Sequence, residues 1–151
     1  MICNFFDLKR ELIMKKERNN INIIVDFDSI LENIPPTGKN ENRYKKCENY
    51  VWYEGDSVNG TTITLIKNKK YMFILQAKKG NKSIATKLLR FKDDDLILSR
   101  VSNDKLKLKC EAAKEDKTGK NVTMDVRFKD AQGNKCKASW DPTILVDTDP
   151  G

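Results

Sequence analysis

Residues 105–129 constrain the fold of this chain more than any other stretch, because apolar and polar side chains alternate through two runs. The apolar positions of these runs are Leu106, Leu108, Cys110 and Ala112, then Val122, Met124, Val126 and Phe128. A period of two is typical of β-strands that bury one face. The segment 114–120 between the runs is charged and contains Gly119, so the whole stretch predicts a β-hairpin.

The rest of the chain up to Trp140 continues as short apolar or aromatic runs between turn residues. The other expected strands are 21–27, 47–54, 61–66, 71–77, 83–91, 96–101 and 135–140. We expect 61–66 to pair with 71–77 across a short turn. About nine short strands with regularly spaced turns predict an all-β fold, a single antiparallel β-barrel or β-sandwich built as a meander of about 8–9 strands. A lipocalin-like barrel is slightly preferred over an immunoglobulin-like sandwich.

The length of 151 residues predicts one domain. Apolar residues recur at helical spacing between Phe5 and Leu12, so residues 1–20 are expected to form a short N-terminal helical segment that packs on the domain. Residues 21–140 then form the antiparallel β domain, and residues 141–151 form a C-terminal tail.

Basic residues outnumber acidic ones by 29 to 22, which gives a formal net charge of +7 at pH 7. Such an excess favours an anionic partner, either a small ligand or a protein, with nucleic acid as the alternative. The competing interpretation is that lysines solvate the outer faces of the strands, because acidic residues are interspersed among them. No apolar run approaches the roughly 18 residues that span a bilayer, so no membrane span is expected.

Four cysteines and three Asn-x-Ser/Thr sequons favour an extracellular, secreted protein. The candidates for disulfide bonds are Cys3, Cys47, Cys110 and Cys136, and the candidates for glycosylation are Asn59, Asn81 and Asn121. The apolar phase of their strands turns Cys110 and Cys136 into the core, where a bond from either to Cys47 is easier than a bond between them. The alternative is a cytoplasmic protein with free, buried thiols.

The residue types in this chain argue against catalysis. There is no histidine, which removes the usual general base near neutral pH and excludes Ser-His-Asp and Cys-His sites. The acidic run 93–95 fits a solvated turn. Asp26 and Asp28 fit a strand edge and the cap of a short helical turn that stops at Pro35. We therefore predict no catalytic residue, no metal site and no cofactor.

The leading functional hypothesis is a non-enzymatic binding protein that sequesters a ligand or engages a partner protein through its β-scaffold. In a barrel, a set of aromatic side chains would line the ligand pocket. The members of this set are Tyr50, Trp52, Tyr53, Tyr71 and Phe73. The competing interpretation is that these rings form the core.

Two alternatives remain open. The first is a basic nucleic-acid-binding β-barrel of the oligonucleotide-binding type, which needs exposed aromatics beside a basic groove. The lysines that flank the strand of Tyr71 and Phe73 are Lys67, Lys69, Lys70, Lys78, Lys79 and Lys82. The second concerns residues 35–38, whose sequence Pro-Pro-Thr-Gly is similar to the tip of a binding loop in chagasin-type inhibitors of cysteine proteases. This resemblance implies a protease-inhibitor-like β-sandwich, although the tryptophan that follows the glycine in those loops is missing here.

Overall fold

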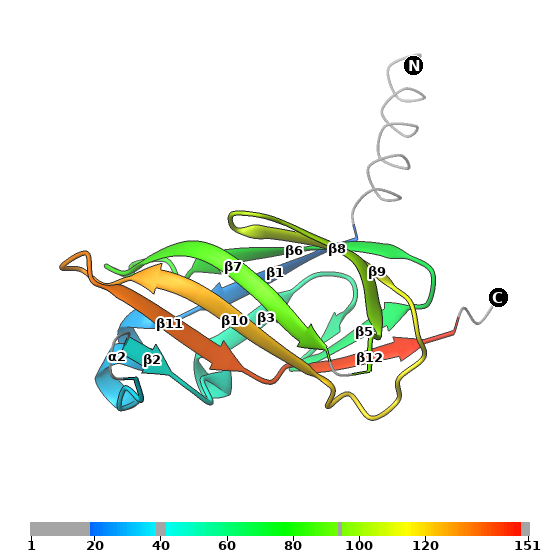
Figure 1. The fold of residues 1–151 in the computed structure, drawn as a ribbon, viewed down its shortest axis with the longest axis horizontal. Helices are drawn as coiled ribbons and strands as arrows, with labels where there is room; N and C mark the ends of the chain where they lie inside the picture. Colours follow the sequence, from blue (N-terminus) through cyan, green and yellow to red (C-terminus); the bar gives the residue numbers. More distant parts are fainter. Residues whose placement is uncertain (1–18, 39–41, 94, 149–151) are drawn as a thin grey trace, which may run out of the picture.

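The structure is a computed structural model that describes residues 19–38, 42–93 and 95–148 (Figure 1). The expected N-terminal helical segment lies outside the described residues except for Asn19 and Asn20, and so does Cys3. The described residues are mostly β-strand, which confirms the predicted all-β fold class.

The elements are short and follow one another closely. The single α-helix among the described residues is α2, Phe27–Asn33, and a 3-10 turn covers Glu48–Tyr50. The strands are β1 Asn20–Val25, β2 Asn42–Tyr44, β3 Val51–Glu54, β4 Val58–Asn59, β5 Thr62–Ile66, β6 Lys70–Ala77, β7 Ile84–Asp93, β8 Leu98–Asp104, β9 Lys107–Ala112, β10 Val122–Lys129, β11 Lys135–Trp140 and β12 Thr143–Asp147.

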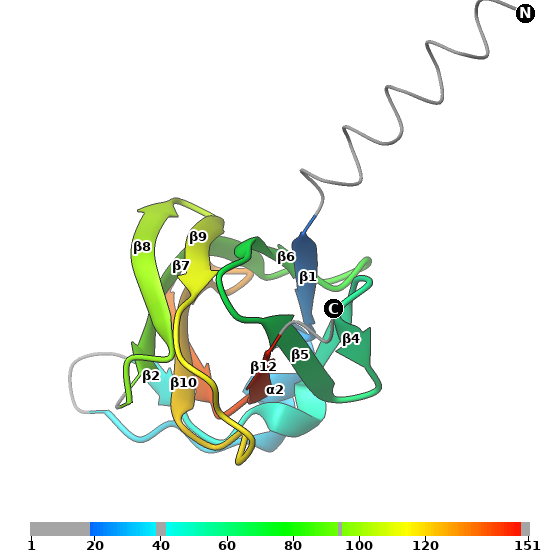
Figure 2. The same ribbon diagram turned by 90° about the vertical axis from the view of Figure 1, so that its right-hand side faces the viewer.

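The strands form three sheets around one core (Figure 2). The five-stranded sheet has the order β3-β1-β6-β9-β8, the four-stranded sheet β2-β11-β10-β7, and the three-stranded sheet β12-β5-β4. The described strands do not close into one hydrogen-bonded ring. The architecture is therefore sandwich-like, and the slightly preferred barrel is not formed.

The sheets are mixed rather than purely antiparallel. Three strand pairs are parallel: β1 with β6, β11 with β2, and β12 with β5. A parallel pair needs a long crossover, and β1 and β6 are separated along the chain by α2 and four strands. The prediction of an antiparallel meander is wrong on this point, because alternation along a strand specifies its buried face but not its neighbour.

For the two alternating runs of residues 105–129, the sequence likewise predicts the buried face but not the neighbouring strand. Their phase is confirmed, since Leu108, Cys110, Val126 and Phe128 are at most 3% exposed. The predicted hairpin is wrong, because β9 pairs with β6 and β8 while β10 pairs with β7 and β11. The connection between them instead runs beside β12, where the backbones of Asp116 and Val146 exchange two hydrogen bonds of 2.9 Å.

The expected pairing of 61–66 with 71–77 is wrong for a similar reason. The corresponding strands, β5 and β6, lie in different sheets. The turn between them contains Asn68 with φ 72°, a conformation that asparagine tolerates better than most residues. The chain therefore passes at this turn from one sheet to another instead of folding back as a hairpin.

The C-terminal segment contributes a strand to the core, although residues 141–151 were expected to be a tail. β12 pairs along its whole length with β5, from Thr143 opposite Thr62 to Asp147 opposite Ile66. Ile144 is 1% exposed, and Val146 is fully buried. The short apolar run 144–146 could have indicated this strand, but the proline just before it, Pro142, favoured a loop.

The three described cysteines are free and buried, which overturns the predicted disulfide bonds among Cys47, Cys110 and Cys136. Burial raises the pKa of the Cys110 thiol to about 12 and that of Cys47 to about 11. The inward orientation predicted for Cys110 and Cys136 is confirmed. Among the described residues, no helix has the length and apolar character needed to cross a membrane.

Candidate functional site

The aromatic residues predicted to line a pocket do not converge on one, although Tyr71 lines the groove described below. Phe73 is fully buried and Tyr71 is 4% exposed, both on the inner face of β6, whereas Trp52 on β3 is 45% exposed. Tyr50 ends the 3-10 turn and is half-buried. Tyr53 is also half-buried, and its hydroxyl accepts a hydrogen bond from the Trp140 indole. Most of these rings therefore pack against the core, as the competing interpretation held.

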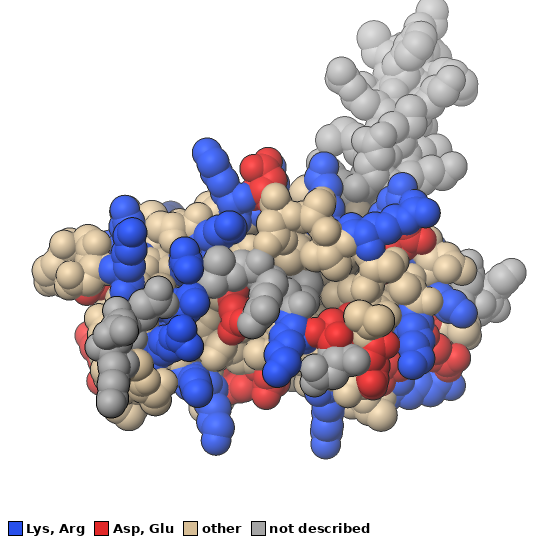
Figure 3. Space-filling model, viewed as in Figure 1, with Lys and Arg blue, Asp and Glu red and all other residues tan. Residues whose placement is uncertain are grey.

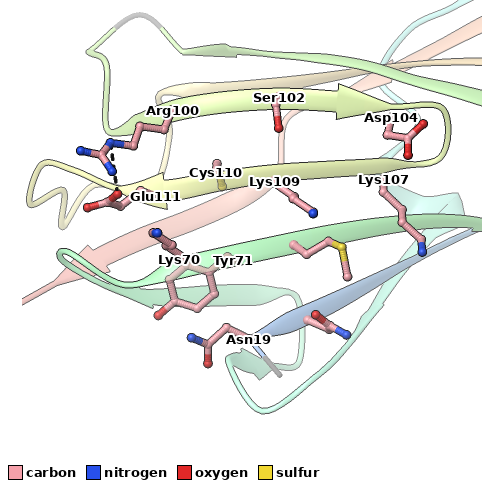
Figure 4. A pocket seen from close by; sticks show the side chains of 12 residues that line it. Asn19, Lys70, Tyr71, Arg100, Ser102, Asp104, Lys107, Lys109, Cys110 and Glu111 are labelled. Atoms are coloured by element: carbon pink, nitrogen blue, oxygen red, sulfur yellow. Dashed lines mark ion pairs between the residues drawn. The ribbon is translucent and has the colours of Figure 1, made fainter. Parts of the chain in front are cut away.

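A groove of about 680 Å³ lies instead on the five-stranded sheet, over β6, β8, β9 and the start of β1 (Figure 4). Its charged lining residues are Lys70, Arg100, Asp104, Lys107, Lys109 and Glu111. Asn19, Asn20 and Ser102 add amide and hydroxyl groups. Tyr71, Met72 and Cys110 also line it, so the groove combines charged and polar groups with apolar surface.

Strand alternation explains why these side chains share a face. On β9, Leu108 and Cys110 point into the core, so Lys107 and Lys109 point outward. The register of strand pairing then places outward-facing residues of neighbouring strands side by side. Lys109 lies opposite Met72 of β6 and also opposite Ser102 of β8. Residues far apart in the sequence are thus held side by side by the ladder of hydrogen bonds.

The charge in the groove is predominantly positive. The Arg100 Nε lies 3.6 Å from the Glu111 Oε2, so these two charges largely offset each other. The register between β8 and β9 shifts between Ser99 and Ser102, and Arg100 has φ 51°, both marks of a β-bulge at this point. Apart from this ion pair, the charged lining residues are three lysines and one carboxylate, that of Asp104. The groove can therefore attract an anion and offer it several donors.

Sequence reasoning missed most of this site. Tyr71 belongs to the predicted aromatic set and does line the groove, but the sequence places Lys70 only among the lysines of the nucleic-acid alternative. It places Lys107 and Lys109 in the solvated phase of a regular strand. That polar phase was the available signal. It could not distinguish a flat solvated face from a hollowed one, because the hollow depends on the neighbouring strands.

The lysines of the nucleic-acid alternative are not arranged as that function requires. Lys70 lines the groove, while the Lys78 Nζ lies 3.6 Å from the Asp26 carboxylate and 5.3 Å from the centre of the Trp52 ring. Lys67, Lys69, Lys79 and Lys82 are exposed. Tyr71 and Phe73 cannot stack on bases while they are buried. On the face formed by β7, β10 and β11, basic and acidic residues are mixed rather than segregated (Figure 3).

Asp26 and Asp28 join α2 to the turn between β6 and β7. Asp26, not Asp28, caps the helix: its carboxylate accepts hydrogen bonds from the backbone and hydroxyl of Ser29. Asp28 accepts from the backbone N–H groups of Lys82 and Ser83 and from the Ser83 hydroxyl. Partial burial acts to raise the pKa of each carboxyl, but these hydrogen bonds outweigh it and the net shift is downward. Both groups are therefore structural acceptors.

The sequon asparagines differ in how freely a glycan could attach. The Asn81 Nδ2 donates to Asp26 at 3.0 Å, and the Asn121 Nδ2 donates to Asp116 at 3.0 Å. A glycan on either nitrogen would have to be fitted around these contacts. Asn59 is exposed beside the turn between β4 and β5. It is the sterically easiest acceptor of the three.

Other candidate positions behave as ordinary structure. Asp93 accepts hydrogen bonds from the backbone N–H groups of Ile97 and Leu98, as expected for a turn. In the region that the structure describes, no group of three or more His, Cys, Asp or Glu side chains could hold a metal ion. In the 35–38 loop, Thr37 donates its backbone N–H to the Arg43 carbonyl at 2.8 Å.

Comparison with known proteins adds information on the fold. No family model matches the sequence, and no curated protein matches it. Among solved structures, the chain is similar to the inclusion body protein PixA from Burkholderia cenocepacia, with a TM-score of 0.56 and 10% sequence identity. The match covers 85% of this chain and 95% of that one. At this identity the likeness establishes a shared all-β, sandwich-like fold.

Proposed function

We propose that this protein is a non-catalytic binding protein whose groove on the five-stranded sheet takes a small anionic organic ligand. The observation that carries the proposal is the set of three lysines, Lys70, Lys107 and Lys109, in a hollow of about 680 Å³. A volume of this size is in the range of small-molecule sites. The ligand class follows from charge, since ammonium groups donate to carboxylate, phosphate or sulfate oxygens.

The scaffold supports a binding role because paired strands fix the backbone positions of the three lysines. Lys107 and Lys109 belong to one strand that is paired on both sides, and Lys70 begins the neighbouring strand. Sites on regular strands are held more precisely than sites on loops. Ser102 and the two asparagines at the entry to β1 could then select among anions by hydrogen bonding.

The proposal that the protein is non-catalytic has its own support. The chain lacks histidine. Burial raises the pKa of the Cys110 and Cys47 thiols, which keeps them protonated and weakly nucleophilic near neutral pH. Partial burial acts to raise the pKa of Asp116, but hydrogen bonds from Thr118 and Asn121 outweigh it and leave an ionised structural acceptor. These groups are poorly suited to nucleophilic or general acid–base chemistry.

The proposal is tested by titrating the ¹⁵N-labelled full chain with citrate, a compact polyanion, and following backbone amide shifts. We expect saturable shifts at groove positions such as Met72, Ser102 and Lys109. The double variant Lys107→Ala, Lys109→Ala should weaken binding about tenfold, since two charge-assisted contacts at a solvated site together contribute about 1.4 kcal/mol.

The matched control is Lys129→Ala, Lys135→Ala, which removes two exposed lysines that face each other in the other large sheet. This variant loses the same charge but should bind citrate as the wild type does. Equal weakening in both double variants would mean that only net charge matters and would overturn the groove assignment. Tighter binding of single-stranded DNA, with shifts at lysines all over the surface, would favour the nucleic-acid alternative.

A further inference from the structure

The outer face of the five-stranded sheet carries an apolar strip that begins in the groove. On β6, Met72 and Ile74 alternate with core residues and point to the outer face. On β1, Ile24 does the same, and its partner on β3 is Trp52. The first three side chains are half-buried, and Trp52 is 45% exposed. We call these four residues the apolar strip.

The strip is continuous because register brings its members together. Ile74 lies opposite Asn22 on β1 and Ile24 lies opposite Gln76 on β6, so Ile74 and Ile24 are diagonal neighbours on the same face. Diagonal neighbours on a sheet face lie about 7–8 Å apart, within reach of long side chains. Asn20 and Asn22 on β1 and Gln76 on β6 border the strip with polar groups. At the far end of the strip, the Lys78 ammonium lies over the Trp52 ring, 5.3 Å from its centre.

The groove lysines adjoin the strip directly. Lys109 is the cross-strand partner of Met72, and Lys107 is the cross-strand partner of Ile74. These two lysines therefore stand at one end of an apolar path that crosses β6, β1 and β3, while Lys78 at the other end is paired with the Asp26 carboxylate at 3.6 Å. Three strand spacings from β9 to β3 amount to about 14 Å. A compact anion would use the lysines and leave this path in contact with water.

We infer that the ligand is an anionic amphiphile, whose charged group lies between Lys107 and Lys109 and whose alkyl or aryl part lies along the apolar strip toward Trp52. This inference rests on the proposed function and names the ligand class of the same groove. It is argued from charge complementarity at one end and from the partly exposed apolar side chains that lead away from it. A ligand of this kind would contact both the groove lysines and the apolar strip.

The test uses the full chain and a series of straight-chain carboxylates, hexanoate, octanoate and decanoate, below their micellar concentrations. Trp52 fluorescence reports the far end of the strip, while Trp140, at 2% exposure, supplies a constant background. We expect affinity to rise at least about tenfold from hexanoate to decanoate, because each fully buried methylene gives about a fourfold gain. Only the longer chains should shift the Trp52 emission to the blue.

Two matched controls separate the contribution of the ligand's alkyl chain from that of its charged group. Ile74→Thr should flatten the dependence on chain length, whereas Ile84→Thr, at a 64% exposed isoleucine of β7, should leave it unchanged. Decyltrimethylammonium, with a similar chain and the opposite charge, should bind much more weakly than decanoate. Equal binding of the two would overturn the assigned head-group site.

The remaining outcomes distinguish this inference from the proposed function. If citrate shifts the groove amides but affinity is independent of chain length, the proposed function stands and the amphiphile inference is wrong. If neither citrate nor any carboxylate shifts those amides, the proposed function itself is wrong. If Trp52 emission is already blue in the free chain and no amphiphile changes it, another segment covers the strip and the inference is overturned.

Discussion

The indole N–H of Trp140 in β11 donates a 2.8 Å hydrogen bond to the hydroxyl oxygen of Tyr53 in β3. The bond links the four-stranded sheet to the edge strand of the five-stranded sheet, across 87 positions of sequence. Trp140 is 2% exposed, so its N–H has little access to water if the partner is removed. Burial also raises the pKa of the Tyr53 hydroxyl far above its ordinary value, which keeps that group protonated.

Tyr53→Phe should lower the free energy of unfolding by about 1–3 kcal/mol, because it leaves a buried donor without an acceptor. Tyr50→Phe, at a half-buried tyrosine three positions earlier, should lower it by less than about 0.5 kcal/mol. Urea unfolding of the two variants beside the wild type measures the difference. Equal losses would show that the link between the sheets contributes nothing specific.

The strand phase is tested by neighbouring positions of β10. Val126→Lys should unfold the domain or cost several kcal/mol, because Val126 is fully buried and the new ammonium would have no partner there. Arg127→Ala should change stability by less than about 0.5 kcal/mol, since Arg127 is exposed. Moreover, Arg127 lies opposite Lys137 and Lys87, so removing its like charge relieves repulsion. Similar urea midpoints for the two variants would contradict this assignment.

These two residues also show what the sequence could predict. Alternation alone correctly assigned Val126 to the core and Arg127 to the surface, because the side-chain period of a strand is a local property. It could not predict that β10 pairs with β7 rather than with β9. Partner choice depends on contacts between distant segments, since β10 pairs with β7 and β9 pairs with β6, and alternation within one strand does not specify these contacts.

The candidate site was less accessible to prediction than the fold. The groove is lined by residues of β1, β6, β8 and β9, which are brought together by the parallel pairing of β1 with β6 and by the pairing of β8 with β9, interrupted at Arg100. Neither has a marked sequence signal. The aromatic residues were conspicuous in the sequence, but Phe73 and Tyr71 occupy the inward phase of β6 and pack in the core, and of the two only Tyr71 also lines the groove.

The thiols should be insensitive to the redox state of the solution. Because Cys47, Cys110 and Cys136 are free and buried, we expect no change in melting temperature on adding reductant. In the native state these three thiols should resist a thiol-reactive dye and should react only after unfolding. A melting temperature that falls by several degrees with reductant would contradict the structure. Cys110→Ala should cost about 1 kcal/mol, as expected for lost packing.

The carboxylates that join α2 to the turn between β6 and β7 should make stability depend on pH at the acid end. The pKa of Asp28 is lowered in the folded state, because hydrogen bonds from Lys82 and Ser83 outweigh its partial burial. The folded chain therefore holds a proton on this group less tightly than the unfolded chain. The stabilisation is present above the ordinary pKa of 3.8 and is lost as pH falls below it.

Asp28→Asn should consequently destabilise the protein near neutral pH by about 1–3 kcal/mol and flatten the decline of stability between about pH 5 and pH 2. Glu32→Gln, at an exposed residue of the same helix, is the control and should do neither. Urea midpoints measured across this pH range decide the matter. If Asp28→Asn retains the full decline of stability at acid pH, that decline is caused by other carboxylates.

The packing of β12 against the loop before β10 gives the last prediction. Gly119 has φ 70°, and a Cβ built on it would lie 2.9 Å from the Thr143 methyl carbon and 3.0 Å from the Leu145 Cδ2. Gly119→Ala should therefore lose stability both from the backbone conformation and from displacement of β12. Gly133 has φ 83° with nothing within 4 Å of such a Cβ, so Gly133→Ala carries the backbone cost alone, about 1 kcal/mol. We expect Gly119→Ala to exceed that cost by about 1–2 kcal/mol in urea unfolding, the range for overpacking at a close contact. Equal costs would mean that β12 is not held against this loop, and that residues 143–147 behave as the tail that the sequence suggested.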